Sequence, residues 1–346
     1  MKHQTTRYGE IPFYKIGTFG NTADAFISKK LFLEYKTKYS FPKKGDILIS
    51  ASGTIGRAVI YDGKPAYFQD SNIVWIDNDE TLVKNDFLFY AYSNIKWNTE
   101  HTTILRLYND NFRNTLIPLP PLNEQSAIAN ILSALDRYLY ALDALILKKE
   151  GVKKSLSFEL LSQRKRLKGF NQAWQKVRLG DIANYLTSNL SAEQITQQGK
   201  IKVYDVNNFI GYTDTTFISD KPYISIVKDG SVGRVRILPP KTNILSTMGA
   251  LIANHKTTTE FLFYLLSNFD FKNFTSGSII PHIYFKDYKE KTIFLPPLNE
   301  QIAIADILSA LDKEIASLKN KKRQFENIKK ALNHDLMSAK IRVLKK

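Results

Sequence analysis

The stretch that decides the fold is LPPLNEQSAIANILSALD at residues 119–136, which returns as LPPLNEQIAIADILSALD at residues 295–312. The copies lie 176 residues apart, and only two of their eighteen positions differ. The same offset relates KKSLSFELLSQRKR, which begins at Lys153, to KKALNHDLMSAKIR, which begins at Lys329. The chain is therefore organised as a variable region, a repeat, a second variable region and a second repeat.

Both copies of the repeat have the features of a long helix. Asn123 and Asn299 follow a proline pair and are suited to cap a helix, and a glutamate follows each of them in the first turn. Apolar residues then recur at alternating spacings of four and three, the pattern of a coiled-coil seam. The seam consists of Ile128, Leu132, Leu135, Leu139, Leu142 and Ile146 in the first copy, and of Ile304, Leu308, Leu311, Ile315 and Leu318 in the second. We expect each helix to cover about 45 residues, or roughly 65–70 Å at 1.5 Å per residue.

A helix of this length with one apolar stripe needs a partner that covers the stripe. The obvious partner is the other copy, and we favour an antiparallel pair, which would place the two variable regions at opposite ends. The alternative is that each helix binds a separate partner.

The variable regions read as divergent copies of one mainly β domain. GTIGR at 53–57 matches GSVGR at 230–234, and FLFY occurs at 87–90 and at 261–264. We expect a strand at 232–238 and short helices at 81–95 and 257–269. The predicted fold class is α+β, with two mainly β domains separated by the two helices. The predicted boundaries are 1–118 for the first domain, 119–170 for the first helix, 171–294 for the second domain and 295–346 for the second helix.

The composition favours a polyanionic partner. The 346 residues include 49 Lys and Arg against 33 Asp and Glu, which gives a net charge of +16, and the charge is spread along the chain. Nucleic acid is the first candidate partner, and a merely basic protein without such a partner is the alternative. The sequence has no cysteine, which excludes disulfides, cysteine-ligated zinc and a thiol nucleophile. No leader or membrane-spanning stretch is apparent, so we expect a cytoplasmic protein without contact to a membrane.

The motifs of several enzyme classes are missing from the sequence. It contains no phosphate-binding GxxxxGK[ST] loop and no GxSxG nucleophile elbow. It also lacks the Asn/Asp-Pro-Pro-Tyr/Phe motif of an amino-methyltransferase. The histidines, which are His3, His101, His255, His282 and His334, form no cluster with metal-ligand spacing. We therefore predict no catalytic residue, no metal site and no cofactor.

The order of variable regions and LPPLNEQ helices resembles the specificity subunit of a type I restriction-modification system, over nearly the whole chain. The resemblance implies two target recognition domains, each reading one half of a split double-stranded DNA site. It implies that the two conserved helices form an antiparallel coiled coil and dock two methyltransferase subunits, and that restriction (motor-nuclease) subunits join for cleavage. It also implies that the chain itself is not catalytic, in agreement with the missing motifs.

The first domain departs from the family pattern at its start. The second domain opens with WQKVRLGDI at 174–182, which resembles the usual domain start. The first domain has no such segment and begins near YGEIP at 8–12, which resembles a stretch further into the domain. We therefore expect an opening strand to be absent, which leaves open whether the first domain folds and reads DNA.

Residue types that bind phosphates or base edges give the candidate DNA contacts. In the first domain these are Ser52, Thr54, Arg57, Arg106, Asn109, Asn111 and Arg113, and in the second they are Ser231, Arg234, Arg236, Ser276, Ser278 and His282. The glycines of the two GxxGR loops permit a close approach to another backbone. The alternative is an ordinary β-turn with an exposed arginine, and for residues 106–113 a solvated loop.

The repeated polar residues at the helix starts are candidates for docking a partner. They are Asn123, Glu124 and Gln125 in the first copy and Asn299, Glu300 and Gln301 in the second. Helix capping explains them equally well. Two other functions also remain: a recognition fragment of a fused methyltransferase-nuclease enzyme, and a coiled-coil adaptor that binds only proteins.

Overall fold

The computed structural model describes residues 4–68, 72–97 and 106–344, and the chain divides into two compact units. Unit 1 consists of Met1–Asp143 and Asn320–Lys346, and unit 2 consists of Ala144–Lys319. Each unit contains one variable region together with half of each long helix. Within the described residues, no helix is long and apolar enough to cross a membrane.

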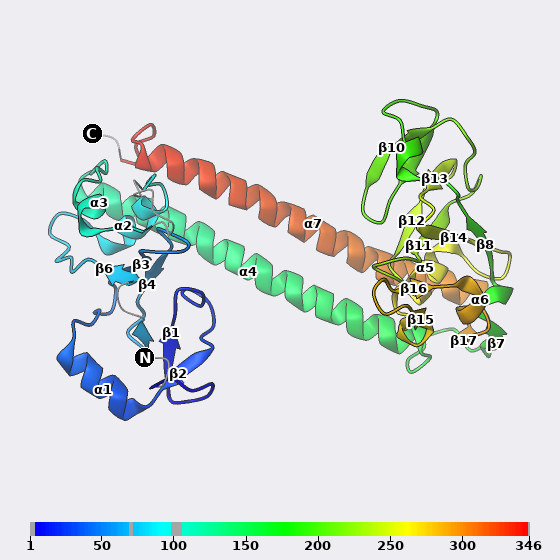
Figure 1. Ribbon diagram of the computed structural model, residues 1–346, viewed down its shortest axis with the longest axis horizontal. Coiled ribbons are helices and arrows are strands. Elements are labelled where there is room, and N and C mark those ends of the chain that lie inside the picture. Colours follow the sequence, from blue (N-terminus) through cyan, green and yellow to red (C-terminus); the bar gives the residue numbers. More distant parts are fainter. Residues whose placement is uncertain (1–3, 69–71, 98–105, 345–346) are drawn as a thin grey trace. The chain divides into compact units, whose positions relative to one another are not determined.

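The two repeats form the long helices α4 (Leu122–Leu161) and α7 (Leu298–Met337), labelled in Figure 1. Each has 40 residues, somewhat fewer than expected. Both end just before a residue in the left-handed conformation, Gln163 with φ +62° and Ala339 with φ +55°. Such a residue ends an α-helix because its backbone cannot continue the right-handed turn.

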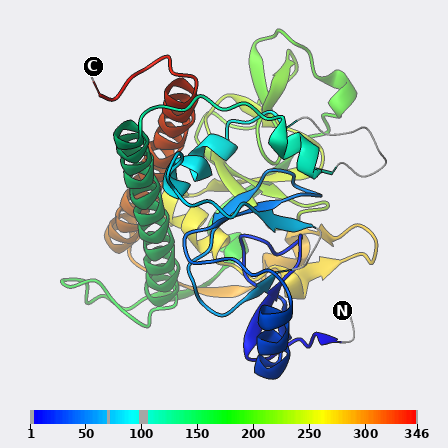
Figure 2. The ribbon, with the colours of Figure 1, turned by 90° about the vertical axis from the view of Figure 1, so that its left-hand side faces the viewer.

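The half-helices of each unit pair in antiparallel orientation, as predicted, and Figure 2 shows those of unit 1 side by side. In unit 1, Lys322 of α7 forms an ion pair with Asp143 of α4, and Lys329 forms one with Asp136. Residue numbers therefore rise along α7 while those of the partners fall along α4. Unit 2 has the same arrangement, with ion pairs that join Glu150 to Lys319, Lys149 to Glu314 and Lys153 to Asp312.

The predicted seam lies between the paired half-helices. Ile128, Leu132, Ile304 and Leu308 are almost completely buried, and Leu142, Ile146 and Ile315 are at most 7% exposed. The remaining seam residues, Leu135, Leu139, Leu311 and Leu318, are partly buried.

The variable region of unit 2 contains two main sheets. The larger is antiparallel, in the order β12-β11-β14-β8, and consists of β8 (Ala183–Thr187), β11 (Tyr223–Val227), β12 (Val235–Leu238) and β14 (Met248–Ala253). The smaller, in the order β10-β9-β13, consists of β9 (Ile201–Tyr204), β10 (Phe209–Thr213) and β13 (Thr242–Ile244).

Short elements complete unit 2 and connect the sheets to the long helices. Helix α5 (Thr259–Ser267) belongs to the same hydrophobic core as the larger sheet and the start of α7. The other elements are the pair β7 (Gln175–Arg178) and β17 (Thr292–Leu295), the hairpin β15 (Thr275–Ser276) and β16 (His282–Ile283), the helix α6 (Phe285–Tyr288), and the 3₁₀ turns η2 (Leu179–Asp181), η3 (Ala192–Gln194) and η4 (Lys272–Phe274).

Unit 1 repeats this plan with fewer strands. One sheet, in the order β4-β3-β6, consists of β3 (Ile47–Ser50), β4 (Ala58–Ile60) and β6 (Ile73–Trp75). The other, in the order β2-β1-β5, consists of β1 (Ile11–Tyr14), β2 (Ala25–Ile27) and β5 (Tyr67–Phe68). The helices are α1 (Lys29–Lys38), α2 (Asn85–Tyr92) and α3 (Asn109–Arg113).

The observed elements agree with the α+β prediction. The helices expected at 81–95 and 257–269 are α2 and α5, and the strand expected at 232–238 begins later, at Val235, because residues 230–233 form a turn. In the part of unit 1 that the structure describes, no strand corresponds to β7 or β8. The four domain boundaries stay a prediction.

The seam gives a direct test of the helix packing. Leu308→Ala removes a fully buried side chain from the core of unit 2, and we expect the free energy of unfolding to fall by about 2–5 kcal/mol. Ile302 lies on the same helix but is 49% exposed, so Ile302→Ala serves as the control. It should change the free energy of unfolding by less than about 0.5 kcal/mol. Urea unfolding measures both values, and equal effects of the two substitutions would contradict the packing described here.

Candidate nucleic-acid interface and helix junctions

The two GxxGR loops adopt the same turn between equivalent strands. Gly56 N–H donates to the Ser50 carbonyl at 3.0 Å, and Gly233 N–H donates to the Val227 carbonyl at 2.9 Å. Both glycines have φ +79°, and a Cβ on Gly56 would lie 2.3 Å from Nε1 of Trp97. Glycine is therefore required by conformation and by space, and the match found in the sequence reflects one local structure.

Each loop pairs with a second segment that also contains predicted DNA contacts. In unit 1, Ser52 forms an isolated β-bridge with Arg106, and Ser52 Oγ donates to Asn72 Oδ1 at 2.7 Å. In unit 2, the equivalent bridge joins Asp229 to His282, whose Nδ1 lies 2.6 Å from the aspartate Oδ1. The structure thus brings the two predicted groups of each domain together.

The predicted arginines of the loops and their strands differ in what they contact. The Arg57 guanidinium donates to the Phe19 carbonyl at 2.9 Å, and that of Arg236 donates to the Asn207 carbonyl at 2.9 Å. Arg57 thereby ties the β3–β4 hairpin of unit 1, and Arg236 the β11–β12 hairpin of unit 2, to a turn of the other sheet of the same unit. Arg234 is exposed, and its guanidinium has no partner among the described residues.

The other predicted contacts lie beside these loops with different exposures. Thr54, Arg106, Asn109, Arg113, Ser231, Ser276 and Ser278 are exposed, His282 and Asn111 are partly buried, and Ser52 is buried. Asn111 accepts a hydrogen bond from Tyr108 N–H at 2.6 Å and so caps α3, which is a structural use of the side chain. Whether any of these residues contacts DNA stays a prediction.

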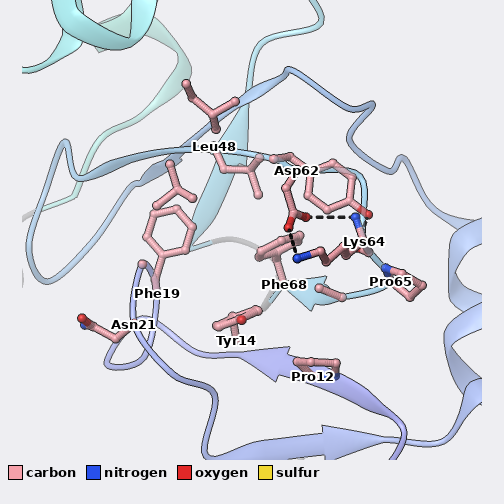
Figure 3. A pocket seen from close by; sticks show the side chains of 14 residues that line it. Pro12, Tyr14, Phe19, Asn21, Leu48, Asp62, Lys64, Pro65 and Phe68 are labelled. Atoms are coloured by element: carbon pink, nitrogen blue, oxygen red, sulfur yellow. Dashed lines mark hydrogen bonds and ion pairs between the residues drawn. The ribbon is translucent and has the colours of Figure 1, made fainter. Parts of the chain in front are cut away.

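A cavity of about 420 Å³ in unit 1 is lined by residues of β1, β3, β4 and β5 and of the turns next to them, and Figure 3 shows its lining. Tyr14, Phe19 and Phe68 supply aromatic walls, and Asp62 and Lys64 form an ion pair at its side. In unit 2 the position of Val59, which also lines the cavity, is taken by Arg236, whose guanidinium lies 5.2 Å from the Tyr204 ring centre. The two variable regions therefore present different surfaces on the same framework.

The starts of α4 and α7 are anchored by a buried glutamine. The Gln301 side-chain amide donates to the carbonyls of Lys256 and Pro296, and its oxygen accepts from the Thr257 hydroxyl at 2.8 Å. Gln125 does the same in unit 1, where it contacts Leu82, Lys84 and Pro120. Each glutamine thereby connects its helix to the segment that precedes α5 or α2.

The neighbouring glutamate connects the start of one long helix to the segment that follows the other. Glu300 is completely buried and accepts two hydrogen bonds from the Arg166 guanidinium and one from Trp174 Nε1, at 2.9 Å. In unit 1, Glu124 accepts the equivalent pair from Arg342 and a hydrogen bond from Val343 N–H at 3.2 Å. The Arg342 guanidinium is the main reason why the pKa of Glu124 lies below its usual range.

A Tyr–Asp–Lys cluster connects the variable region of each unit to the paired half-helices of that unit. In unit 2, Tyr264 donates from its hydroxyl to Asp312 at 2.8 Å, and Lys153 contacts both the aspartate and the tyrosine ring. Tyr90, Asp136 and Lys329 form the same cluster in unit 1. Burial raises the pKa of both tyrosines, and the hydrogen bond to the aspartate raises it further, so both stay protonated at neutral pH.

The structure thus gives the predicted docking residues an internal role. Glu124, Gln125, Glu300 and Gln301 are at most 2% exposed. Asn123 and Asn299 are exposed and take no part in these hydrogen-bond networks. Asn123 Oδ1 and Asn299 Oδ1 each accept a hydrogen bond from the following N–H at 2.9 Å. Docking through this motif stays a prediction, and its exposed members are the two asparagines.

Sequence reasoning missed several residues of these networks. Four residues were not singled out: Asn72, Arg166, Asp229 and Arg342. The two arginines nevertheless stand at equivalent places of the repeat, in RKRL at 164–167 and KIRV at 340–343. The repeat itself was the signal, because a charged residue kept in both copies next to a helix end suggests a shared contact. The described residues contain no group of three or more potential metal ligands, and His3 and His101 lie outside them.

Comparison with known protein families identifies similar chains. The family model described as type I restriction modification DNA specificity domain matches residues 1–149 and again 171–327. A type I restriction enzyme specificity subunit of Haemophilus influenzae is 65% identical over 133 residues, which are 38% of this chain and 34% of the relative. The chain therefore matches about a third of that relative's length.

Two further relatives cover most of the chain. The MjaVIII type I restriction enzyme specificity subunit of Methanocaldococcus jannaschii is 25% identical over 362 aligned residues, which are 92% of this chain and 84% of the relative. Among solved structures, the type I restriction-modification S subunit of M. genitalium superimposes with a TM-score of 0.65 and 20% identity, covering 97% of this chain and 91% of that one. The similarity to the M. genitalium structure concerns the fold.

The buried glutamate of unit 2 can be tested by substitution. Glu300→Gln removes the charge that Arg166 and Trp174 contact, and we expect the free energy of unfolding to fall by about 1–3 kcal/mol, the cost of an unsatisfied buried polar group. Trp174→Phe is the matched variant, because it removes the indole donor and leaves the guanidinium pair in place. Its effect should be smaller, and a larger effect of Trp174→Phe in urea unfolding would contradict the leading role of the guanidinium.

The pH dependence of stability tests the equivalent pair in unit 1. Because the native pKa of Glu124 is lowered, its ion pair stabilises the fold above the usual glutamate pKa and ceases to do so as the pH falls through the lowered native value. We expect Arg342→Gln to lower the Tm at pH 7, and we expect this difference in Tm to shrink as the pH falls below the usual glutamate pKa. A constant difference in Tm across this range would show that charge is not what the arginine contributes.

Proposed function

Because this chain belongs to the family of type I restriction-modification DNA specificity subunits, we propose that it reads a split, asymmetric DNA target with one recognition region in each unit. The observation that carries the proposal is the repeated pairing of a GxxGR loop with a second polar segment, Ser52 with Arg106 and Asp229 with His282. Subunits of this family are not themselves enzymes, and we assign no catalytic residue, metal or cofactor to the chain.

The surroundings of the two loops support two different half-sites. The first loop presents Thr54, and its Arg57 binds the Phe19 carbonyl, whereas the second presents Ser231 and an exposed Arg234. Arginine and hydroxyl groups bind phosphates and base edges, so both loops have suitable chemistry. Because the side chains differ, the two regions would favour different sequences, and the target would lack two-fold symmetry.

We further propose that the starts of α4 and α7 dock two copies of a methyltransferase subunit, and that restriction subunits join this complex. Two near-identical exposed surfaces support this, since Leu122 and Asn123 on α4 correspond to Leu298 and Asn299 on α7. The buried glutamate and glutamine behind them hold the helix starts in shape. Such a complex would act in the cytoplasm, where cellular DNA is accessible in a bacterium or archaeon.

The test is a genome-wide map of N6-methyladenine in cells that express this chain with its cognate methyltransferase subunit. We expect one split asymmetric motif. A symmetric motif built from a single half-site would mean that only one recognition region reads DNA. The absence of methylation, with the methyltransferase shown to be active beside an intact specificity subunit, would overturn the proposal and favour a protein-binding adaptor.

Arg234→Ala tests the second half-site in the same assay. Since one good arginine contact is worth about 1–3 kcal/mol, we expect methylation at the motif to fall by about tenfold or more, or the second half-site to become degenerate. Arg323→Ala removes the same charge from an exposed position on α7 and serves as the control. Equal effects of the two substitutions would indicate a general charge effect.

A further inference from the structure

The space between the two sheets of the variable region differs between the units. In unit 1 this space is the cavity of about 420 Å³ in Figure 3, and all of the residues that line it belong to the described part of the chain. The volume lies within the range of about 300–1,000 Å³ that is typical of sites for small organic ligands. The floor of the cavity is formed by buried residues of one hydrophobic cluster, which include Phe19 and Leu48.

The strand registers show which side chain takes the equivalent place in unit 2. Val59 on β4 corresponds to Arg236 on β12, and Tyr14 on β1 corresponds to Tyr204 on β9. The Arg236 guanidinium lies over the Tyr204 ring, 5.2 Å from its centre. In unit 1 the shorter Val59 and Tyr14 both line the cavity, so the place that a planar guanidinium takes in unit 2 is open to a planar ligand.

Unit 1 has an aromatic residue where unit 2 has an aliphatic one. The strand partner of Tyr14 is Phe68, and the partner at the equivalent position of unit 2 is Ile244. The rings of Tyr14 and Phe68 are nearly parallel, with centres 5.6 Å apart and an angle of 15° between their planes. Phe19 meets Phe68 edge to face, with ring centres 6.5 Å apart. These walls suit a flat aromatic group, which can stack on one ring and meet the edge of another.

Polar groups lie at the edge of the cavity. The Tyr14 hydroxyl and the Asn21 side-chain amide have no hydrogen-bond partner among the described residues, so they can bind the polar edge of a ligand. Asp62 is already occupied, because it accepts from Lys64 N–H at 2.9 Å and pairs with the Lys64 ammonium at 3.4 Å. The Lys64 side chain is 84% exposed, and its ammonium keeps donors for a second anion. A neutral ring that carries a phosphate therefore fits the cavity better than a cation.

The cavity shares a turn with the candidate DNA interface. Arg57 of the GTIGR loop donates to the Phe19 carbonyl at 2.9 Å, and a Cβ on Gly20 would lie 3.5 Å from Arg57 Cδ. Phe19 and Gly20 also line the cavity. The shared turn favours bound DNA as the source of a ligand with a ring and a phosphate.

We propose that the cavity of unit 1 binds the base of a nucleotide that is turned out of a DNA duplex, with the base on the rings of Tyr14 and Phe68 and its phosphate near Lys64. Every nucleobase has a π-face, and stacking on aromatic side chains is a general means of holding unpaired bases. For the source of the base, the inference rests on the proposed function. A free nucleotide offers the same chemistry, and the test separates the two.

Two DNA probes test the site on the full chain. One is a duplex with a single unpaired nucleotide, and the other is the same duplex fully paired. Because the unpaired base leaves the stack at lower cost, we expect the first duplex to bind at least about fivefold tighter in fluorescence anisotropy. Deoxynucleoside monophosphates should bind in the millimolar range in isothermal titration calorimetry, with one nucleotide per chain.

Val59→Arg places in the cavity the side chain that unit 2 has. We expect its guanidinium to cover the Tyr14 ring, the Tm to be maintained, and both the binding of monophosphates and the preference for the unpaired nucleotide to disappear. Leu33→Arg is the matched control, because it adds the same charge on α1, where the side chain is 51% exposed and lies outside the cavity. It should leave both measurements unchanged.

Lys64→Gln tests the phosphate contact without changing the aromatic walls. It should weaken the binding of deoxyadenosine monophosphate by about threefold or more and leave that of deoxyadenosine unchanged. Binding of monophosphates that Val59→Arg abolishes, without a preference for the unpaired nucleotide, would overturn DNA as the source and assign the cavity to a free nucleotide.

The absence of binding by any monophosphate at millimolar concentration, or equal losses in Val59→Arg and Leu33→Arg, would overturn the nucleobase site. The methylated motif is a separate readout of the proposed function. A split motif together with absent nucleobase binding would refute the cavity site alone, whereas absent methylation would refute the reading of DNA.

Discussion

The structure depends on the burial of the first turn of each long helix. Glu300 and Gln301 have no access to solvent, and Glu124 and Gln125 have almost none, so their hydrogen bonds are made with the protein. Each glutamate binds an arginine that follows the other long helix, and each glutamine binds the segment before α2 or α5. A buried carboxylate is strongly unfavourable without such partners, and this requirement fixes how the two helices meet within each unit.

Of the other contacts between the paired half-helices, some are the same in both units and some differ. Both units have the Tyr–Asp–Lys cluster, but at another pair of equivalent positions the two units have different residues and different contacts. Tyr138 packs against Phe325 in unit 1, and their counterparts in unit 2 are the ion pair of Glu314 and Lys149. The duplicated framework therefore tolerates changes where solvent is near, whereas the buried residues at the helix starts are the same in both copies.

The two recognition regions show how one framework can present different surfaces. The glycine loop, the segment beside it and the order of the strands recur, while Val59 and Arg236 occupy equivalent positions with opposite character. The larger difference is the segment Gln175–Thr187, which completes the core in unit 2. These differences contrast with the helix starts, whose buried glutamate and glutamine are the same in both units.

The sequence by itself determined the duplication, the long helices, the α+β class and the family resemblance, because these follow from identity between the copies and from apolar spacing, which are properties of the linear chain. Only the tertiary structure decided that Glu124, Gln125, Glu300 and Gln301 are internal anchors, and that Arg57 and Arg236 bind backbone carbonyls. The reason is that burial and partner choice depend on residues distant in sequence, such as Arg166 and Glu300, whose approach no local pattern encodes.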